Sequence, residues 1–141
     1  MTNLEFLMPV LVLVLWTLVM WIWMYATRIP AMTAAKIDPN DARHPGTYSD
    51  KIPSNVRAVA DNYNHLHEQP TLFYALMMFT AVTGGGTYTM LYLAFGYVGL
   101  RVLHSLVQVL SPNVMLRFFT FAISTIVLMA MAIIEALRVF L

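Results

Sequence analysis

A run of 22 residues without a single charge, from Phe6 to Thr27, limits what this chain can fold into. About 20 apolar residues let a helix cross a hydrocarbon core of about 30 Å, so the run predicts a membrane-spanning helix. A cleaved signal peptide fits poorly, because no basic residue precedes the run and Trp21, Trp23 and Tyr25 stand near its end. In the whole chain of 141 residues, 60% are hydrophobic and 11% are charged. We therefore expect an integral membrane protein.

Three further apolar stretches follow the first. They are separated by a polar loop over 28–53, by three successive glycines at 84–86 and by Ser111-Pro112-Asn113, all of which favour turns over helix. The pattern predicts one all-α transmembrane domain over residues 1–141, an antiparallel up-and-down four-helix bundle. Its predicted spans cover about 5–27, 55–83, 87–110 and 114–140.

Positive charge predicts how the bundle lies in the membrane. Lys and Arg collect in short cytoplasmic loops. The loop over 28–53 and its flank hold Arg28, Lys36, Arg43, Lys51 and Arg57, whereas the first five residues and the glycine turn hold none. We expect the loop to be cytoplasmic and both termini to lie on the non-cytoplasmic side. The chain contains no run of basic residues, so a nucleic-acid partner is not predicted. It also contains no cysteine, which excludes thiolate metal sites.

Two polar stripes lie at the cytoplasmic ends of the second and third predicted spans. Arg101, His104 and Gln108 are spaced i, i+3 and i+7, which places them on one face of a helix. The other stripe consists of Asp61, Asn64, His65 and Glu68. Ionisable groups within a membrane are costly and usually face a bundle interior or a wet cavity. The stripes therefore predict a polar pocket that opens toward the cytoplasm.

The two stripes contain charges at matching depth. Glu68 lies 17 residues before Gly85 and Arg101 lies 16 residues after it. At a helical rise of about 1.5 Å per residue, both lie roughly 25 Å from the glycine turn on neighbouring antiparallel helices. We expect Glu68 and Arg101 to pair. Such a pair either holds a ligand or only fixes the register of two helices.

Two other polar groups invite alternative interpretations. Gln108 and Arg117 lie four residues before and five after Pro112, so they also share a depth. Arg117 either faces the pocket or extends to the lipid headgroups. A metal site is a further alternative, but its ligand set is incomplete, and we expect none. Its ligands would be His65, Glu68 and His104.

In their order along the chain, these residues resemble the MAPEG family (membrane-associated proteins in eicosanoid and glutathione metabolism). The family has an Asn/Glu/Pro/Phe cluster at the second helix, an Arg-x-x-His pair in the third helix and an arginine at the start of the fourth. The matching residues here are Asn64, Glu68, Pro70, Phe73, Arg101, His104 and Arg117. Each motif is short, but their joint order covers most of the chain and is more specific.

The resemblance implies a homotrimer that binds glutathione at each protomer interface, near the cytoplasmic face. It implies that Arg117 is catalytic, because a positive charge stabilises the glutathione thiolate. The glutathione-binding residues that it implies are Asn64, Glu68, Arg101 and His104, with Gln108 at the position of a family tyrosine. A bacterial inner-membrane protein of this kind would act as a transferase or peroxidase on lipophilic electrophiles that arrive from the lipid bilayer.

Besides Gln108, three positions depart from the family pattern. Tyr63 precedes the asparagine where catalytic members have an arginine, and Phe118 and Phe121 replace hydroxyl residues of the prostaglandin-synthase branch. Fewer hydrogen-bond donors would therefore face a ligand. The alternative function is that of a non-enzymatic relative that binds a lipid or a partner protein. A channel is disfavoured, because the outer halves of the spans carry little that would hold water.

Overall fold

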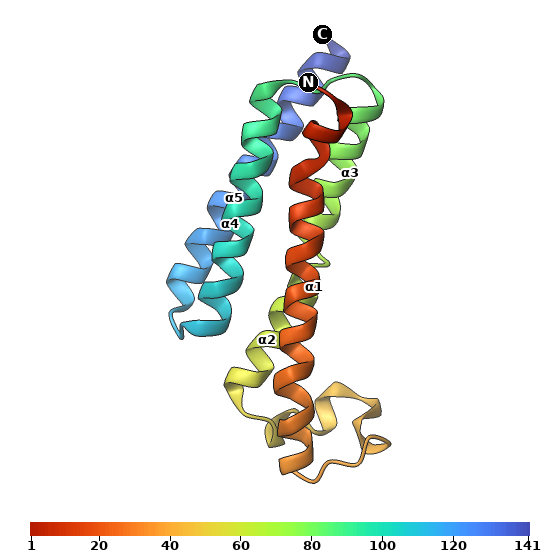
Figure 1. Cartoon of the computed structure of the whole chain (residues 1–141). Coiled ribbons are helices and arrows are strands. Elements are labelled where there is room, and N and C mark those ends of the chain that lie inside the picture. Colours follow the sequence, from red (N-terminus) through yellow and green to blue (C-terminus); the bar gives the residue numbers. More distant parts are fainter.

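The computed structural model describes residues 1–141, except for the side chain of Pro45. Its helices are α1 (Asn3–Ala34), α2 (Ser54–His65), α3 (Gln69–Val82), α4 (Tyr88–Leu110) and α5 (Val114–Phe140), and three short 3-10 helices lie in the loop after α1: η1 (Asp41–Arg43), η2 (Pro45–Thr47) and η3 (Ser49–Lys51). The described residues form no strand, so the chain is all-helical, as predicted. Helices α2 and α3 follow one another along α1, α4 and α5 form a hairpin, and both termini lie at the same end (Figure 1).

Three helices are long and apolar enough to cross a membrane. They are α1, α4 and α5, with 32, 23 and 27 residues. Helix α3 has only 14 residues, which corresponds to about 21 Å at the helical rise. It is too short to cross the bilayer alone, so the region predicted as the second span is made of two shorter helices.

The division between α2 and α3 differs from the single helix predicted over 55–83. Pro70 has no N–H, and its ring would clash with the carbonyl group four residues earlier, so a regular helix cannot continue through it. The backbone tightens before the proline, where the N–H groups of His67 and Glu68 donate to carbonyls three residues earlier, at 3.0 and 3.2 Å. Glu68 then leaves helical geometry, with φ −93° and ψ −96°. Its side chain therefore starts from a turn.

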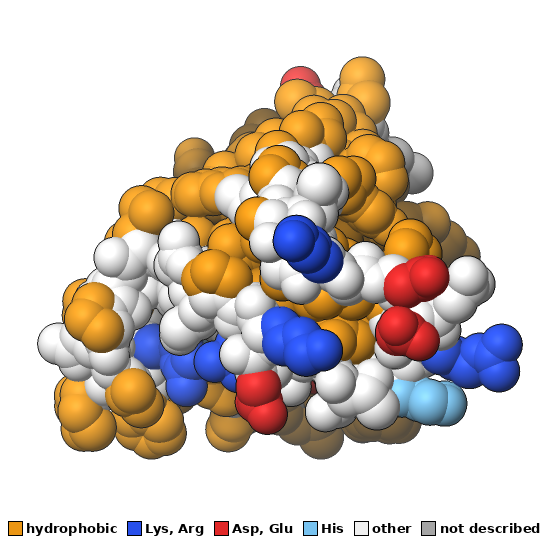
Figure 2. Space-filling model, turned by 90° about the horizontal axis from the view of Figure 1, so that it is seen from below, with side chains coloured by type: hydrophobic (Ala, Val, Ile, Leu, Met, Phe, Trp, Pro, Cys, Tyr) orange, Lys and Arg blue, Asp and Glu red, His pale blue; other side chains and the backbone are white. Residues whose placement is uncertain are grey.

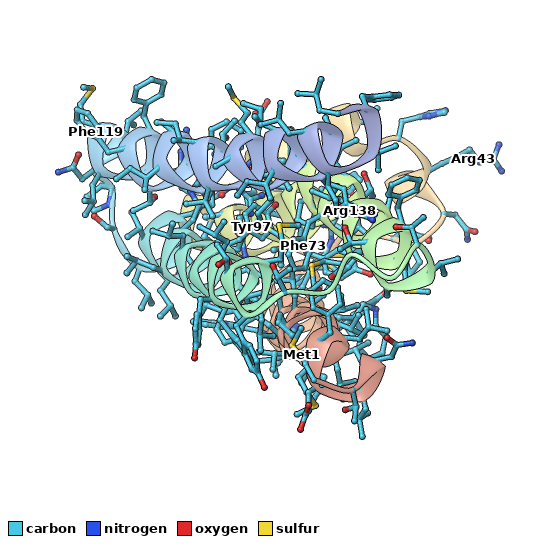
Figure 3. The ribbon with its side chains drawn as sticks, turned by 90° about the horizontal axis from the view of Figure 1, so that it is seen from above. Met1, Arg43, Phe73, Tyr97, Phe119 and Arg138 are labelled. Atoms are coloured by element: carbon cyan, nitrogen blue, oxygen red, sulfur yellow. The ribbon has the colours of Figure 1, made fainter. Side chains whose placement is uncertain are left out.

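The core lies where α1, α3, α4 and α5 meet. Phe73 of α3 and Tyr97 of α4 stack with ring centroids 4.6 Å apart, and Figure 3 shows both side chains pointing into the space between the helices. Gln69, the first residue of α3, donates to Thr125 of α5 at 2.8 Å and accepts from the Tyr97 hydroxyl at 3.4 Å. These contacts hold the start of α3 in the interior, where its polar side chain has protein partners.

The two kinds of surface are separated along the molecule. Charged side chains gather at the end that carries the loop (Figure 2), and Arg28 of α1 ties that loop down by donating to the Tyr48 hydroxyl. The flanks of α1 and α5 expose large apolar side chains, among them Leu15, Ile22, Ile126 and Ile133. This distribution fits an integral membrane protein with apolar flanks in lipid.

The opposite end is closed by an ion pair. Glu135 of α5 is 3% exposed and accepts from Arg138 Nε at 3.0 Å and from Arg138 Nη2 at 2.6 Å. The same Nη2 donates to the Thr83 hydroxyl at 2.5 Å. The guanidinium lies so close to Gly85 that a Cβ there would be 2.5 Å from Arg138 Nε. The pair therefore connects the end of α5 to the turn between α3 and α4.

We expect Gly85→Ala to lower the thermal unfolding temperature of the detergent-solubilised protein, because the new methyl group displaces Arg138 from Glu135 and leaves a buried carboxylate without its partner. Gly96→Ala is the matched control, since nothing lies within 4 Å of a Cβ at that helical position and alanine favours a helix by about 1 kcal/mol. Equal unfolding temperatures for the two variants would show that the ion pair does not stabilise the turn.

Candidate functional site

A pocket of about 560 Å³ lies between the ends of α2 and α4 and the first turns of α5. Small-molecule sites commonly enclose about 300–1,000 Å³. Five of the six predicted site residues line it, namely Asn64, Glu68, His104, Gln108 and Arg117. The other lining residues are Asp61, His65, Val114, Phe118 and Phe121. The polar stripes of the second and third predicted spans therefore do converge on one pocket.

The pocket has a polar wall and an apolar wall. Asp61, Asn64 and His65 come from the last turns of α2, and Glu68 from the turn that follows. The facing wall, from α5, is apolar except for the exposed side chain of Arg117. A molecule in this pocket would contact carboxylates on one side, and aromatic carbon together with Arg117 on the other.

Glu68 contacts His65 in the pocket wall. Its Oε2 lies 3.0 Å from His65 Nδ1, and 67% of the Glu68 side chain is exposed, against 25% for His65. The His65 ring packs with its centroid 5.1 Å from that of His104 and 5.3 Å from that of Phe121. The predicted pair of Glu68 with Arg101 is therefore wrong. The depth calculation assumed a regular helix from Glu68 to the glycine turn, whereas Glu68 lies in the break before Pro70.

Arg101 is the predicted site residue that does not line the pocket. It is 0% exposed, and its three guanidinium nitrogens have no hydrogen-bond partner among the described residues. Its Cζ lies 5.4 Å from the ring centroid of Phe121 and 6.0 Å from that of Tyr97. The guanidinium is thus held between aromatic rings, which attract a cation only weakly compared with a carboxylate.

His104 fixes the start of α5 against α4. Its Nδ1 lies 3.2 Å from the Arg117 carbonyl oxygen and 3.2 Å from the Thr120 hydroxyl. Since a carbonyl oxygen only accepts, Nδ1 carries the hydrogen and Nε2 is an acceptor. That Nε2 and the Oε1 of Gln108 are buried without a partner among the described residues. Two acceptors of pocket-lining residues are therefore buried without a donor, which is a cost to the folded chain.

Some lining residues were absent from the predicted site. The sequence places Asp61 in the polar stripe, and His65 in that stripe and in the alternative metal site, although the i, i+3 spacing of His65 and Glu68 indicates that these two can interact. Phe118 and Phe121 were noted only as departures from a family pattern. Tyr63 is not in the pocket lining, and its ring packs 4.6 Å from that of His67. Among the described residues, no three His, Asp or Glu side chains are grouped to hold a metal ion.

A model of the MAPEG family matches residues 6–137. The matched range covers nearly the whole chain and includes every residue that lines the pocket. No curated protein and no solved structure matches the chain. The family match confirms the resemblance carried by the sequence motifs.

The isolation of Arg101 leads to a prediction about stability. A buried charge without hydrogen bonds loses its hydration without regaining that free energy from protein partners, so an apolar side chain of similar volume is expected to be tolerated at this position. We expect Arg101→Met to keep or raise the thermal unfolding temperature of the ligand-free protein. Arg28→Met is the control, and it should lower that temperature because it breaks the contact with Tyr48. A large loss of stability in Arg101→Met would mean that a counter-charge reaches Arg101.

Proposed function

The chain belongs to the MAPEG family, and we propose that it is a membrane-bound glutathione-dependent transferase or peroxidase that acts on lipophilic electrophiles. The family includes glutathione-dependent transferases together with other members. The observation that carries the proposal is the pocket itself. It combines carboxylates, an amide and imidazoles on one side with an arginine and aromatic side chains on the other.

The polar groups of the pocket are complementary to glutathione. Its ammonium group suits the Glu68 carboxylate, whose Oε1 is not engaged by His65. Asn64 adds an amide that both donates and accepts. Arg117 offers the guanidinium that a carboxylate or a thiolate requires.

Arg117 is the residue that we assign to catalysis. It lies in the first turn of α5, where the helix dipole adds positive potential to that of the guanidinium. A fixed positive charge beside a thiol favours the thiolate, which is the nucleophilic form. The Arg117 backbone is held by His104, so its side chain starts from a fixed point at the edge of the pocket.

The apolar wall suits the second substrate. Phe118 and Phe121 line the pocket, and Phe119, at the margin of the molecule in Figure 3, is exposed. An electrophile dissolved in the bilayer could thus reach the thiolate along the start of α5. Water has little to bind on this wall, which protects a reactive substrate from hydrolysis.

We also propose a homotrimer with its loop in the cytoplasm and its termini on the opposite side of a bacterial inner membrane. The pocket is lined by α2, α4, α5 and the turn before α3, but not by α1. A second copy could supply the remaining wall, in keeping with sites at protomer interfaces in the family. The charged loop end suits the cytoplasmic face, from which glutathione would enter.

The proposal is tested by isothermal titration with glutathione and by conjugation of glutathione to a chlorinated aromatic acceptor, both on the purified oligomer. We expect saturable heat and enzyme-dependent product. Absence of both would contradict the proposed function. It would favour the alternative of a non-enzymatic relative, for which the aromatic wall without hydroxyl groups is a suitable lipid-binding surface.

Arg117→Ala should lower the conjugation rate by about 100-fold, the loss expected when one preorganised electrostatic contact to a developing anion is removed. The unfolding temperature and the oligomer should change little, because the Arg117 side chain is exposed. Arg43→Ala removes another exposed arginine, far from the pocket in the loop (Figure 3), and should leave the rate unchanged. Equal losses of rate and oligomer stability in Arg117→Ala would assign this residue a structural role.

A further inference from the structure

His65 lies in the pocket wall in a position suited to a general base. It is the last residue of α2 and lines the pocket, and its Nδ1 is 3.0 Å from the Glu68 carboxylate. A carboxylate at Nδ1 favours the tautomer with hydrogen on that atom, which leaves Nε2 as the free acceptor. The carboxylate also stabilises the imidazolium that forms when Nε2 takes a proton. This is the arrangement in which an oriented imidazole activates a nucleophile.

Packing fixes the orientation of the His65 ring. The ring is bounded by His104 of α4 at 5.1 Å and by Phe121 of α5 at 5.3 Å between centroids. Its side chain keeps 25% of its surface exposed. The imidazole is thus held by three contacts and still reaches the pocket.

We propose that His65 is a catalytic residue that removes the thiol proton of glutathione. This inference rests on the proposed function. The proton passes from sulfur to His65 Nε2, and the S–H electron pair stays on sulfur. The thiolate then forms a bond to the electrophilic carbon, and a chlorinated acceptor releases chloride. The imidazolium returns its proton to solvent, so one thiol and one aryl chloride give one thioether, one chloride and one proton.

In this mechanism His65 and Arg117 would have different roles. Arg117 supplies positive charge to the thiolate, whereas His65 accepts the proton that must leave. The charged and titratable groups around His65 are Asp61 on α2, Glu68 in the turn, Arg101 and His104 on α4, and Arg117 on α5. Two carboxylates and two arginines thus lie around the imidazole.

The other two histidines of this region are less suited to the role. His104 uses Nδ1 to hold α5 and has no carboxylate contact to stabilise its imidazolium. His67 is exposed, lies outside the pocket lining and has its Nδ1 2.8 Å from the Tyr63 carbonyl. His67 is therefore a matched control, because it is a histidine in the same turn that lacks both the carboxylate and the pocket.

The test compares His65→Gln with His67→Gln in the full-length membrane protein. We expect His65→Gln to bind glutathione in isothermal titration with nearly the natural affinity, but to lose about 100-fold in conjugation rate. The ultraviolet difference absorbance of the bound thiolate should fall together with the conjugation rate. The natural protein should lose activity toward acid. The rate of His65→Gln should instead rise steadily with pH, because it uses only thiolate formed in solution. His67→Gln should behave like the natural protein.

A second variant keeps the test decisive if His65→Gln is poorly folded. His65→Ala leaves a space at the pocket wall, and added imidazole should restore part of its rate but not that of Arg117→Ala. Glutathione binding and conjugation with an unchanged pH profile in His65→Gln would overturn the role of His65 and leave the proposed function standing. If titration of the natural protein with glutathione releases no heat of binding, both the proposed function and the role of His65 are contradicted. Equal losses of rate and affinity in His65→Gln would make His65 a binding residue and overturn the inference.

Discussion

The break between α2 and α3 is the constraint on which the site depends. In a membrane protein every backbone N–H and C=O needs a partner, and Pro70 removes one donor from the helix. The chain meets this demand with tightened turns at His67 and Glu68. The side chain of Gln69 then anchors the start of α3 to α4 and α5. A consequence is that Glu68 does not continue the face of α2. It lies at the pocket edge, within reach of His65.

The break between α2 and α3 also affects where the charged side chains lie relative to the pocket. Glu68 is drawn toward the pocket, while Arg101 stays enclosed between Tyr97 and Phe121 on a helix without a break. The arginine that faces the pocket is Arg117, which is exposed and starts from a backbone held by His104. The pocket therefore presents a carboxylate and a guanidinium on opposite walls. A ligand that carries both signs of charge is the kind it would select.

Sequence reasoning was strong where local chemistry decides structure. The caps Thr87 and Asn113 accept hydrogen bonds from the N–H groups of Met90 and Leu116, and both lie at breaks visible in the sequence. Helical spacing likewise located the residues of the polar wall. It failed for Glu68, because a measurement of depth along an ideal helix does not contain the proline break. It did not assign His65 to the glutathione site, because the packing of its ring against α4 and α5 is a tertiary contact that spacing on one helix does not reveal.

The start of α5 joins the two halves of the proposed chemistry. Arg117 and the aromatic residues Phe118 and Phe121 share its first two turns, so one rigid element carries both the charge for a thiolate and the surface for an apolar substrate. His65 packs against Phe121 on that same element, and His104 ties it to α4. Proton acceptor, charge and apolar wall are thus connected through packed side chains rather than through mobile loops. Catalytic groups must be held to within about 0.5 Å to be effective, and this packing would supply such support for the proposed chemistry.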